Sequence, residues 1–335
     1  MSITLKKLRD QIIVITGATS GIGLTTARMA ARRGARLVLA ARAEQALIDL
    51  ERELSADQRR VVTVTADVGK PADVQRISRI ARQKFGGFDS WVNNAGVSIY
   101  GKLMDEPLED MRRLFETNFW GVVHGSLEAA RHFRDRQASG AIINVGSNVS
   151  DRSMILLGMY SASKHAVKGF TDALRMELDR DRCPISVTLI QPGSIDTPFP
   201  RHAKNYMEAE ATLPPPVYAP EVVARTILHC TETPKRQVFV GSGGKGIPTL
   251  GYYAPRLADL LMESFFVGQQ KADRPPSQGS HDNGLDRPSG DLQERGDYPG
   301  HVAKSSLYTT ASLHPLLTGA ALVSAGLIIK SLSRR

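Results

Sequence analysis

Cysteine is scarce in this chain of 335 residues, which contains only Cys183 and Cys230. Two cysteines are too few for the disulfide framework of a small secreted protein, and they form no cluster of metal ligands. The sequence therefore excludes a disulfide scaffold and gives no metal site. A reducing compartment is expected.

The N-terminal stretch lacks the features of a secretory signal peptide. Lys6, Lys7 and Arg9 precede only a short apolar run, which leads directly into a glycine-rich turn. A signal peptide needs a basic start, a separate apolar segment and a cleavage site made of small residues. We therefore expect a cytoplasmic protein.

Sequence signatures of nucleic-acid binding are also missing, although the net charge is +9. Excess positive charge can serve nucleic acid, an anionic membrane or an anionic cofactor. The sequence contains no helix-turn-helix, zinc-finger or RNA-binding motif, so nucleic acid is the weakest of the three interpretations.

What the chain does contain is a regular alternation of strands and helices between residues 11 and 240. Short apolar β-rich runs predict strands at Gln11–Thr16, Ala35–Ala40, Val61–Ala66, Ser90–Asn93, Ala141–Gly146, Ile185–Ile190 and Gln237–Val240. Helical periodicity predicts helices at Leu24–Arg33, Glu44–Leu54, Pro71–Phe85, Leu108–Gln137, Tyr160–Arg180 and Pro220–Thr231. This alternation predicts an α/β fold, a Rossmann-like doubly wound parallel sheet of about seven strands with helices on both faces.

A glycine-rich turn, Gly17-Ala-Thr-Ser-Gly21-Ile-Gly23, connects the first strand to the first helix. Backbone N–H groups and the helix dipole face an anion at such a place, and glycines allow a phosphate to approach. The spacing differs from the commoner Gly-x-Gly-x-x-Gly fingerprint of dinucleotide-binding folds. By itself the turn is weak evidence, because most glycine turns are only turns.

No acidic residue follows the second strand, where NAD-specific folds place a carboxylate for the ribose 2′-hydroxyl. Ala41 and Arg42 stand there instead. An arginine suits a 2′-phosphate, so the pair favours NADP(H) over NAD(H), with NAD(H) still possible. The alternative is a solvated surface arginine.

Tyr160 and Lys164 are four residues apart at the start of a predicted helix, so their side chains share one helix face. A nearby cation favours the phenolate and lowers the pKa of a tyrosine, which suits general acid–base catalysis. Ser147 follows a buried strand, at the sheet edge where open α/β folds bind their ligands. The alternative for Tyr160 and Lys164 is an incidental surface pair.

Taken together, these residues resemble the short-chain dehydrogenase/reductase family from about Lys7 to Val240. The resemblance rests on motifs that occur in the expected order on the expected elements. They are Thr16-Gly17-x-x-x-Gly21-Ile22-Gly23, Asp67, Asn93-Asn94-Ala95-Gly96, Asn118, Ser147, Tyr160-x-x-x-Lys164 and Pro192-Gly193 with Thr197. The chain departs from the family pattern at Gly146, where a second serine is common.

The resemblance implies a catalytic role for four residues. Tyr160 would be the general acid/base, and Lys164 would lower its pKa and bind the nicotinamide ribose. Ser147 would hydrogen-bond the substrate oxygen, so Ser147 and Tyr160 would bind substrate. Asn118 would hold a water in the proton relay.

The resemblance also implies a set of cofactor-binding residues. The glycine turn would hold the pyrophosphate, Asp67 and Val68 the adenine edge, and Thr197 the nicotinamide amide. The full set is Gly17, Thr19, Ser20, Gly21, Ile22, Gly23, Arg42, Asp67, Val68, Asn94, Ala95, Gly96, Tyr160, Lys164, Pro192, Gly193 and Thr197. All of them lie upstream of residue 268.

A proline-rich loop, Pro198 to Ala219, follows the sixth predicted strand. In this family the loop at that position covers the substrate. We therefore expect substrate contacts from Phe199, His202, Tyr206 and Met207, although a merely mobile loop is nearly as good an interpretation for each of them. Steroid, retinoid, acyl and small ketone substrates all occur in the family.

Beyond the predicted catalytic domain, 1–267, the composition changes. Residues 268–310 are rich in Pro, Gly, Ser, Asp and Arg, which predicts a disordered linker. Residues 311–335 contain Leu313–Ile329, seventeen residues without a formal charge, close to the length that a transmembrane helix needs. We expect an apolar C-terminal helix that anchors the protein to the cytoplasmic face of a membrane.

The prediction is an NADP(H)-preferring oxidoreductase that interconverts a carbonyl and a secondary alcohol of a small molecule, with lipophilic substrates among the candidates. The resemblance also implies a homodimer or homotetramer. Two alternatives belong to other classes: a non-catalytic dinucleotide-binding sensor, and a membrane-tethered scaffold. Turnover of carbonyls with NADPH would separate the enzyme from both.

Overall fold

The computed structural model describes residues 3–55, 60–241, 246–275, 283–315 and 318–319. Within them a sheet of seven parallel strands has the spatial order β11-β7-β6-β4-β1-β2-β3. The bounds of these strands are β1 Ile12–Thr16, β2 Arg36–Ala41, β3 Val61–Thr65, β4 Ser90–Asn93, β6 Gly140–Val145, β7 Ile185–Pro192 and β11 Gln237–Val240. The predicted doubly wound parallel sheet is confirmed. The strand order reverses between β1 and β4, and open α/β sheets bind ligands at such a point.

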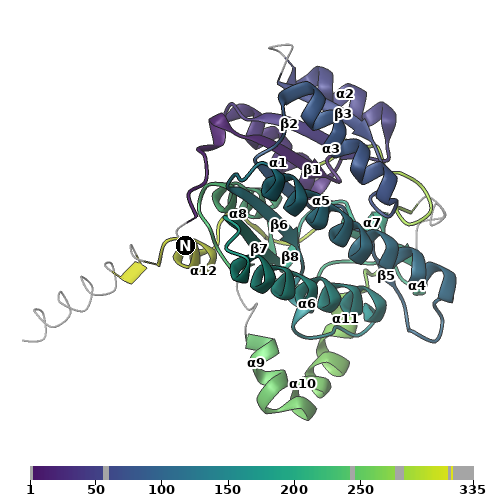
Figure 1. Cartoon of the computed structure of the whole chain (residues 1–335). Coiled ribbons are helices and arrows are strands. Elements are labelled where there is room, and N and C mark those ends of the chain that lie inside the picture. The colour runs from purple at the N-terminus through teal and green to yellow at the C-terminus, as the bar shows by residue number, and fades with distance from the viewer. Residues whose placement is uncertain (1–2, 56–59, 242–245, 276–282, 316–317, 320–335) are drawn as a thin grey trace, which may run out of the picture.

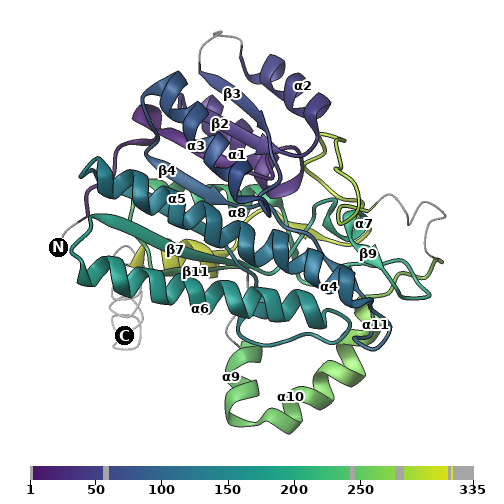
Figure 2. The same cartoon turned by 45° about the vertical axis from the view of Figure 1, so that its right-hand side comes forward.

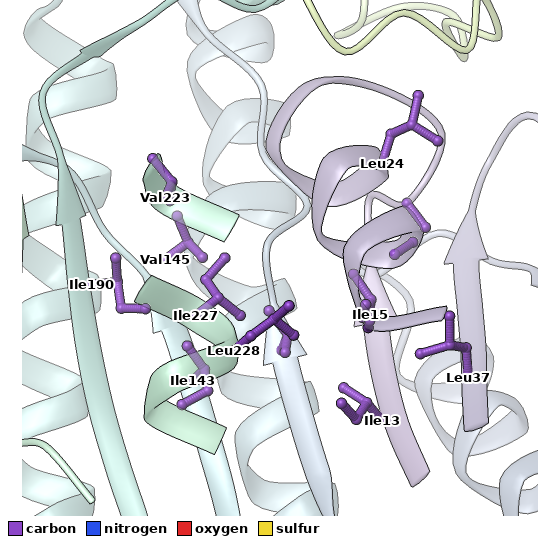
Figure 3. Packing of buried hydrophobic residues seen from close by; sticks show 14 of the residues in the cluster. Ile13, Ile15, Leu24, Leu37, Ile143, Val145, Ile190, Val223, Ile227 and Leu228 are labelled. Atoms are coloured by element: carbon purple, nitrogen blue, oxygen red, sulfur yellow. The ribbon is translucent and has the colours of Figure 1, made fainter. Parts of the chain in front are cut away.

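Helices cover both faces of this sheet (Figures 1 and 2). One face carries α1 (Gly21–Arg32), α2 (Glu44–Leu54) and α8 (Pro220–Glu232), and the other carries α3 (Pro71–Phe85), α5 (Gly121–Asp135) and α6 (Gly158–Arg180). On the first face, Leu24 of α1 and Ile227 and Leu228 of α8 pack against strand residues such as Ile15 and Ile143 (Figure 3). Because both faces are buried, the strands read as continuous apolar runs rather than alternating ones.

The long helix predicted at Leu108–Gln137 contains an irregular turn. The structure has α4 (Leu108–Phe115), a π-helical turn η2 (Glu116–Trp120) and then α5. A π-turn inserts one extra residue, and such turns are frequent at functional sites. It changes the direction of the buried Asn118, which lies inside it.

The segment after β11 forms short helices below the sheet in Figure 1: α9 (Gly246–Tyr253), α10 (Pro255–Leu261), a π-turn η4 (Met262–Phe266) and α11 (Val267–Gln269). This agrees with the sequence, in which apolar residues recur at helical spacing over Tyr252–Val267: Leu257, Leu260, Leu261, Phe265 and Phe266. Its outer side leaves Tyr252, Tyr253 and Leu260 largely exposed, whereas Met262 is buried.

The prediction of a disordered linker over 268–310 is wrong for residues 283–310, which lie on the body of the protein. Leu285 is buried, and β12 (Val302–Ala303) pairs with β10 (Val217–Tyr218). Further along, α12 (Leu307–Leu313) packs against β11 and α8. Ion pairs and backbone hydrogen bonds hold this polar segment, and hydrophobic periodicity cannot reveal such contacts.

Most of the predicted membrane anchor in 311–335 lies outside the described residues. Among the helices that the structure does describe, none is both long enough and apolar enough to cross a membrane.

Candidate active site

A cavity of about 450 Å³ lies at the carboxyl ends of β1, β2, β4, β6 and β7. These strands are parallel, so the residues that follow them meet at one edge of the sheet. The cavity brings together most of the predicted cofactor-binding residues: Gly17, Thr19, Ser20, Gly21, Ile22, Arg42, Asp67, Val68, Asn94, Ala95, Gly96, Pro192, Gly193 and Thr197. Ser147, Tyr160 and Lys164 line the same cavity. Gly23 and Asn118 lie beside it and are not part of its lining.

The glycine turn is built so that main-chain segments touch. Gly17 has a φ of +66°, and a Cβ there would lie 2.8 Å from the Cα of Ala95. A Cβ on Gly23 would lie 2.1 Å from the carbonyl oxygen of Gly17. The side chain of Asn94 donates to the carbonyls of Thr16, at 3.0 Å, and Gly17, at 3.2 Å. Only glycine fits at the two positions.

Helix α1 begins at Gly21, within this turn. The first N–H groups of a helix have no acceptor within the helix and carry a partial positive charge, so they suit a phosphate. Thr19, Ser20 and Ile22 line the cavity beside them. Because the turn and the helix end supply phosphate-binding groups at the edge of the sheet, the site fits a dinucleotide.

The other end of the cavity holds the predicted catalytic residues. Ser147 caps the short helix η3 (Asn148–Ser150), and its Oγ accepts a hydrogen bond from the N–H of Val149 at 3.3 Å. The Ser147 hydroxyl also interacts with the hydroxyl of Tyr160. Lys164 lies one turn further along α6, with its Nζ 5.7 Å from the centre of the Tyr160 ring. The three side chains thus converge at one place in the cavity.

Burial, rather than the neighbouring cation, has the largest effect on the tyrosine. It raises the pKa of the Tyr160 hydroxyl to about 12, and the hydrogen bond with Ser147 lowers that pKa only in part. Burial also lowers the pKa of the Lys164 ammonium to about 8. The phenol is therefore protonated at neutral pH and ready to donate a proton, which is what the reduction of a carbonyl requires. The lowering of the Tyr160 pKa that the sequence suggested is not found in this state of the protein.

The Lys164 ammonium, which is buried, donates to the carbonyl oxygen of Val145 at 2.9 Å. This bond holds the side chain against the end of β6, with its Nζ near Gly96. One hydrogen bond leaves two of its three N–H donors for other acceptors. A partly satisfied buried cation next to a phenol is suited to bind a hydroxylated ligand.

Asn118 supports the site from the side. Its amide accepts from the N–H of Val97 at 2.8 Å and donates to the carbonyl of Val97 at 2.9 Å. It also donates to the Oγ of Ser163 on α6 at 3.1 Å. Asn118 therefore ties the chain after β4 to the helix that carries Tyr160, and its role in a proton relay stays a prediction.

Two of the four loop residues expected to contact the substrate line the cavity. These are Phe199, whose ring centre is 5.6 Å from that of Tyr160, and His202. Tyr206 instead donates to the carboxylate of Asp110, and Met207 packs against the Tyr100–Leu157 cluster. Neither belongs to the lining of this cavity.

The sequence did not indicate several residues that line the site. The lining includes apolar side chains from separate parts of the chain: Tyr100, Met154, Leu157, Leu213, Met262 and Phe266. Near Arg42 it includes Gly284, Pro288 and Ser289 of the C-terminal extension. The apolar helical pattern over Tyr252–Val267 was a usable signal for Met262 and Phe266. No pattern marked Gly284, Pro288 and Ser289.

Comparisons with known proteins agree with this geometry. Residues 11–207 match the family model described as short chain dehydrogenase. The chain is 46% identical over 99% of its length to an uncharacterized oxidoreductase of Bacillus subtilis, YxnA, of which it covers 92%. It is 38% identical over 56% of its length to 11-beta-hydroxysteroid dehydrogenase A of Sesamum indicum, of which it covers 53%.

A solved structure shows the same fold. The chain superposes on a short-chain type dehydrogenase/reductase from Mycobacterium marinum with a TM-score of 0.61 and 25% identity, over 74% of this chain and 98% of that one. The matched family model covers more than half of the chain, and it includes both the glycine turn and Tyr160. The protein is therefore a member of the short-chain dehydrogenase/reductase family, an oxidoreductase that acts on CH–OH groups.

Proposed function

We propose that the protein is an NADP(H)-preferring oxidoreductase that interconverts an apolar ketone and its secondary alcohol, with Tyr160 as general acid/base. The observation that carries the proposal is that Ser147, Tyr160 and Lys164 meet in one cavity with the glycine turn and Arg42. The bound nicotinamide would supply or accept the hydride. Every other chemical task falls to side chains of this chain.

In the direction of reduction, Tyr160 would donate its proton to the oxygen of the substrate carbonyl. The Ser147 hydroxyl would donate a hydrogen bond to the same oxygen and stabilise the negative charge that develops there. Lys164 would hold the ribose and, while charged, favour the phenolate that forms when Tyr160 gives up its proton. In the direction of oxidation the same groups would act in reverse.

The apolar end of the cavity supports a hydrophobic substrate. Leu157 and Phe199 pack next to Tyr160, and Met262 and Phe266 line the same cavity. Apolar walls favour ligands that bury hydrocarbon surface. The similarity to a plant 11-beta-hydroxysteroid dehydrogenase supports the same class. Turnover of a panel of cyclic and polycyclic ketones with NADPH, against short hydrophilic ketones, tests the proposal. Absence of turnover with every carbonyl would contradict it.

The preference for NADP(H) rests on Arg42, which lines the cavity after β2. We expect Arg42→Ala to weaken NADPH binding and to change NADH binding little. A guanidinium bound to a phosphate contributes roughly 1.5–3 kcal/mol, which corresponds to about tenfold to a hundredfold in affinity. Isothermal titration with both cofactors measures the change.

Arg113→Ala is the matched control for Arg42→Ala. Like Arg42, which donates to the carbonyls of Gly284 and Arg287, Arg113 contacts the C-terminal extension. It donates to the carbonyl of Leu285 at 2.9 Å and to the carboxylate of Asp286 at 2.6 Å. Arg113 does not line the cavity. Its loss should affect both cofactors equally. Equal affinity of the wild-type protein for NADPH and NADH would contradict the preference.

The pKa of Lys164 predicts a pH dependence. Because burial lowers that pKa to about 8, the ammonium is charged below pH 8 and loses its proton as the pH rises through that value. The Tyr160 pKa of about 12 keeps the phenol protonated throughout this range. For reduction, kcat/KM for NADPH, which reports the free enzyme, should be level below about pH 8 and fall above it.

Lys168→Met tests whether this pH dependence belongs to Lys164. Lys168 lies one turn further along α6 and pairs with Asp151. The variant should keep the wild-type pH profile. A wild-type profile that stays level to about pH 10 would contradict the assignment to Lys164.

The homodimer or homotetramer expected from the sequence stays a prediction. Light scattering coupled to size-exclusion chromatography would test it.

A further inference from the structure

The segment 283–296 of the C-terminal extension lies along the cavity. Gly284, Pro288 and Ser289 are part of the lining. In Figure 2 this yellow-green segment runs between α7 (Phe199–His202) and α2. The chain reaches α2 just after Arg42 and α7 just after Thr197, and both of these residues line the cavity. The segment therefore connects two sides of the cofactor site.

On one side it binds the start of α1. The N–H of Gly21 donates to the carbonyl of Gln293 at 2.8 Å. The Thr25 hydroxyl donates to one oxygen of the Glu294 carboxylate at 3.0 Å, and Arg28 donates to the other at 2.8 Å. The segment thus bonds directly to the helix end that is suited to a phosphate.

The segment also binds α7 and the start of α8, the helix that packs beside α1. The His202 ring lies 3.2 Å from a carboxylate oxygen of Asp291 and 3.3 Å from the Oγ of Ser289. The guanidinium of Arg295 donates to both carboxylate oxygens of Glu221, at 2.8 and 2.9 Å. These contacts attach the segment to α8 and to α7, the helix that directly follows Thr197, the residue predicted to bind the nicotinamide amide.

Ahead of these anchor residues in the sequence, the segment contacts Arg42. The Nη2 atom of Arg42 donates to the carbonyl of Gly284 and to that of Arg287. Both hydrogens of that nitrogen are thereby used. A guanidinium has five N–H groups. The remaining three, Nε–H and two Nη1–H, have no acceptor among the described residues. The segment orients the guanidinium and leaves its other donors for a ligand.

The attachment is polar and partly exposed. The Arg28 and Glu294 side chains are 22% and 20% exposed, and Leu285 is the buried apolar residue of the segment among those described. Segments with few buried apolar contacts open more readily than the core. The segment can therefore open without unfolding of the sheet.

We propose that residues 283–296 form a clasp over the dinucleotide site, which positions Arg42 and slows the release of bound cofactor. This inference rests on the proposed binding of NADP(H). It extends the cofactor site beyond the 1–267 domain that the sequence suggested. The clasp acts on both NADPH and NADH, because its anchors hold the segment and not the 2′-phosphate.

The test is a double variant of the full-length protein, Glu294→Gln with Arg295→Gln, which removes the ion pairs of the segment with α1 and with α8. Stopped-flow displacement should show NADPH dissociating about threefold to tenfold faster, with a smaller change in the association rate, since loss of such contacts acts mainly on dissociation. NADH should also dissociate faster, but by a smaller factor, because the clasp also positions Arg42 for the 2′-phosphate. Arg42→Ala, in contrast, should affect mainly NADPH.

Glu53→Gln is the matched control. Glu53 on α2 pairs with the same guanidinium of Arg28, at 2.7 Å, but does not touch the clasp. This variant should release NADPH at the wild-type rate. Wild-type release from the double variant would overturn the clasp while leaving the proposed function intact. Failure of the wild-type protein to bind either cofactor would overturn both.

Hydrogen exchange gives a readout that is independent of catalysis. In the full-length protein, amides of 283–296 should exchange about tenfold or more slowly at saturating NADPH than without it, since bound ligand holds the closed state. Amides of β12, further along the extension, should change less. Unchanged exchange in 283–296 would overturn the clasp.

Discussion

Replacement of Tyr160 by phenylalanine should lower kcat by about 10²–10⁴-fold and leave the affinity for NADPH near the wild-type value. Only the hydroxyl is lost. The ring can keep its place beside Phe199, and α6 keeps Lys164 where it is. The buried phenol, with its pKa near 12, is the proton donor that a developing alkoxide needs. Steady-state kinetics with a hydrophobic ketone and a fluorescence titration with NADPH measure the two quantities.

Tyr206→Phe is a matched control, because it removes the same hydroxyl from a tyrosine close to the site. That hydroxyl donates to Asp110 and does not line the cavity. Its kcat should stay within about twofold of wild type, as expected for a group that performs no proton transfer. If Tyr160→Phe kept more than about a tenth of the wild-type kcat, the general acid/base would be another group.

Much of the fold follows from local pattern. The bounds of α2 and α3 match the predicted helices, and the strands fall where short apolar runs end in turn residues. The position of the site can be inferred from the strands, because the carboxyl ends of parallel strands lie at the same edge of the sheet. This shared edge brings Ser147, Arg42 and the glycine turn into one cavity although they are distant in sequence.

The C-terminal extension could not be predicted in this way. Its composition is polar and has no period, which is typical of disorder. Its order comes from pairs far apart in sequence, such as Arg28 with Glu294 and Arg113 with Asp286. No local pattern encodes such partners. The prediction that all cofactor-binding residues lie upstream of residue 268 was made without knowledge of these long-range pairs.

Two finer features depend on packing. Spacing alone places Lys164 next to Tyr160 and suggests a lowered pKa for the phenol, but burial disfavours the phenolate more strongly and raises it. Similarly, Leu108–Gln137 has the periodicity of one helix. That periodicity does not mark the π-turn at Glu116–Trp120, inside which the Asn118 amide bonds to Val97 and Ser163.

Substitution of Gly23 by alanine tests the other half of the site, the phosphate-binding turn. Alanine is favoured over glycine in a helix by about 1 kcal/mol, so local preference alone would stabilise α1. The new Cβ would, however, lie 2.1 Å from the Gly17 carbonyl oxygen and 2.5 Å from the Nδ2 of Asn94. Displacing main chain in a packed region costs ~3 kcal/mol, the larger of the two effects. NADPH should bind on the order of a hundredfold more weakly, and the melting temperature should fall.

Gly169→Ala provides the opposite case on α6. A Cβ at Gly169 meets no atom within 4 Å, so the helix preference acts without a steric cost. This variant should be as stable as wild type or more stable by ~0.5–1 kcal/mol, with unchanged NADPH affinity. Calorimetric titration and thermal unfolding of both variants separate the two effects. If Gly23→Ala bound NADPH as tightly as Gly169→Ala, the turn would tolerate a side chain and could not be the close-fitting phosphate site that its geometry indicates.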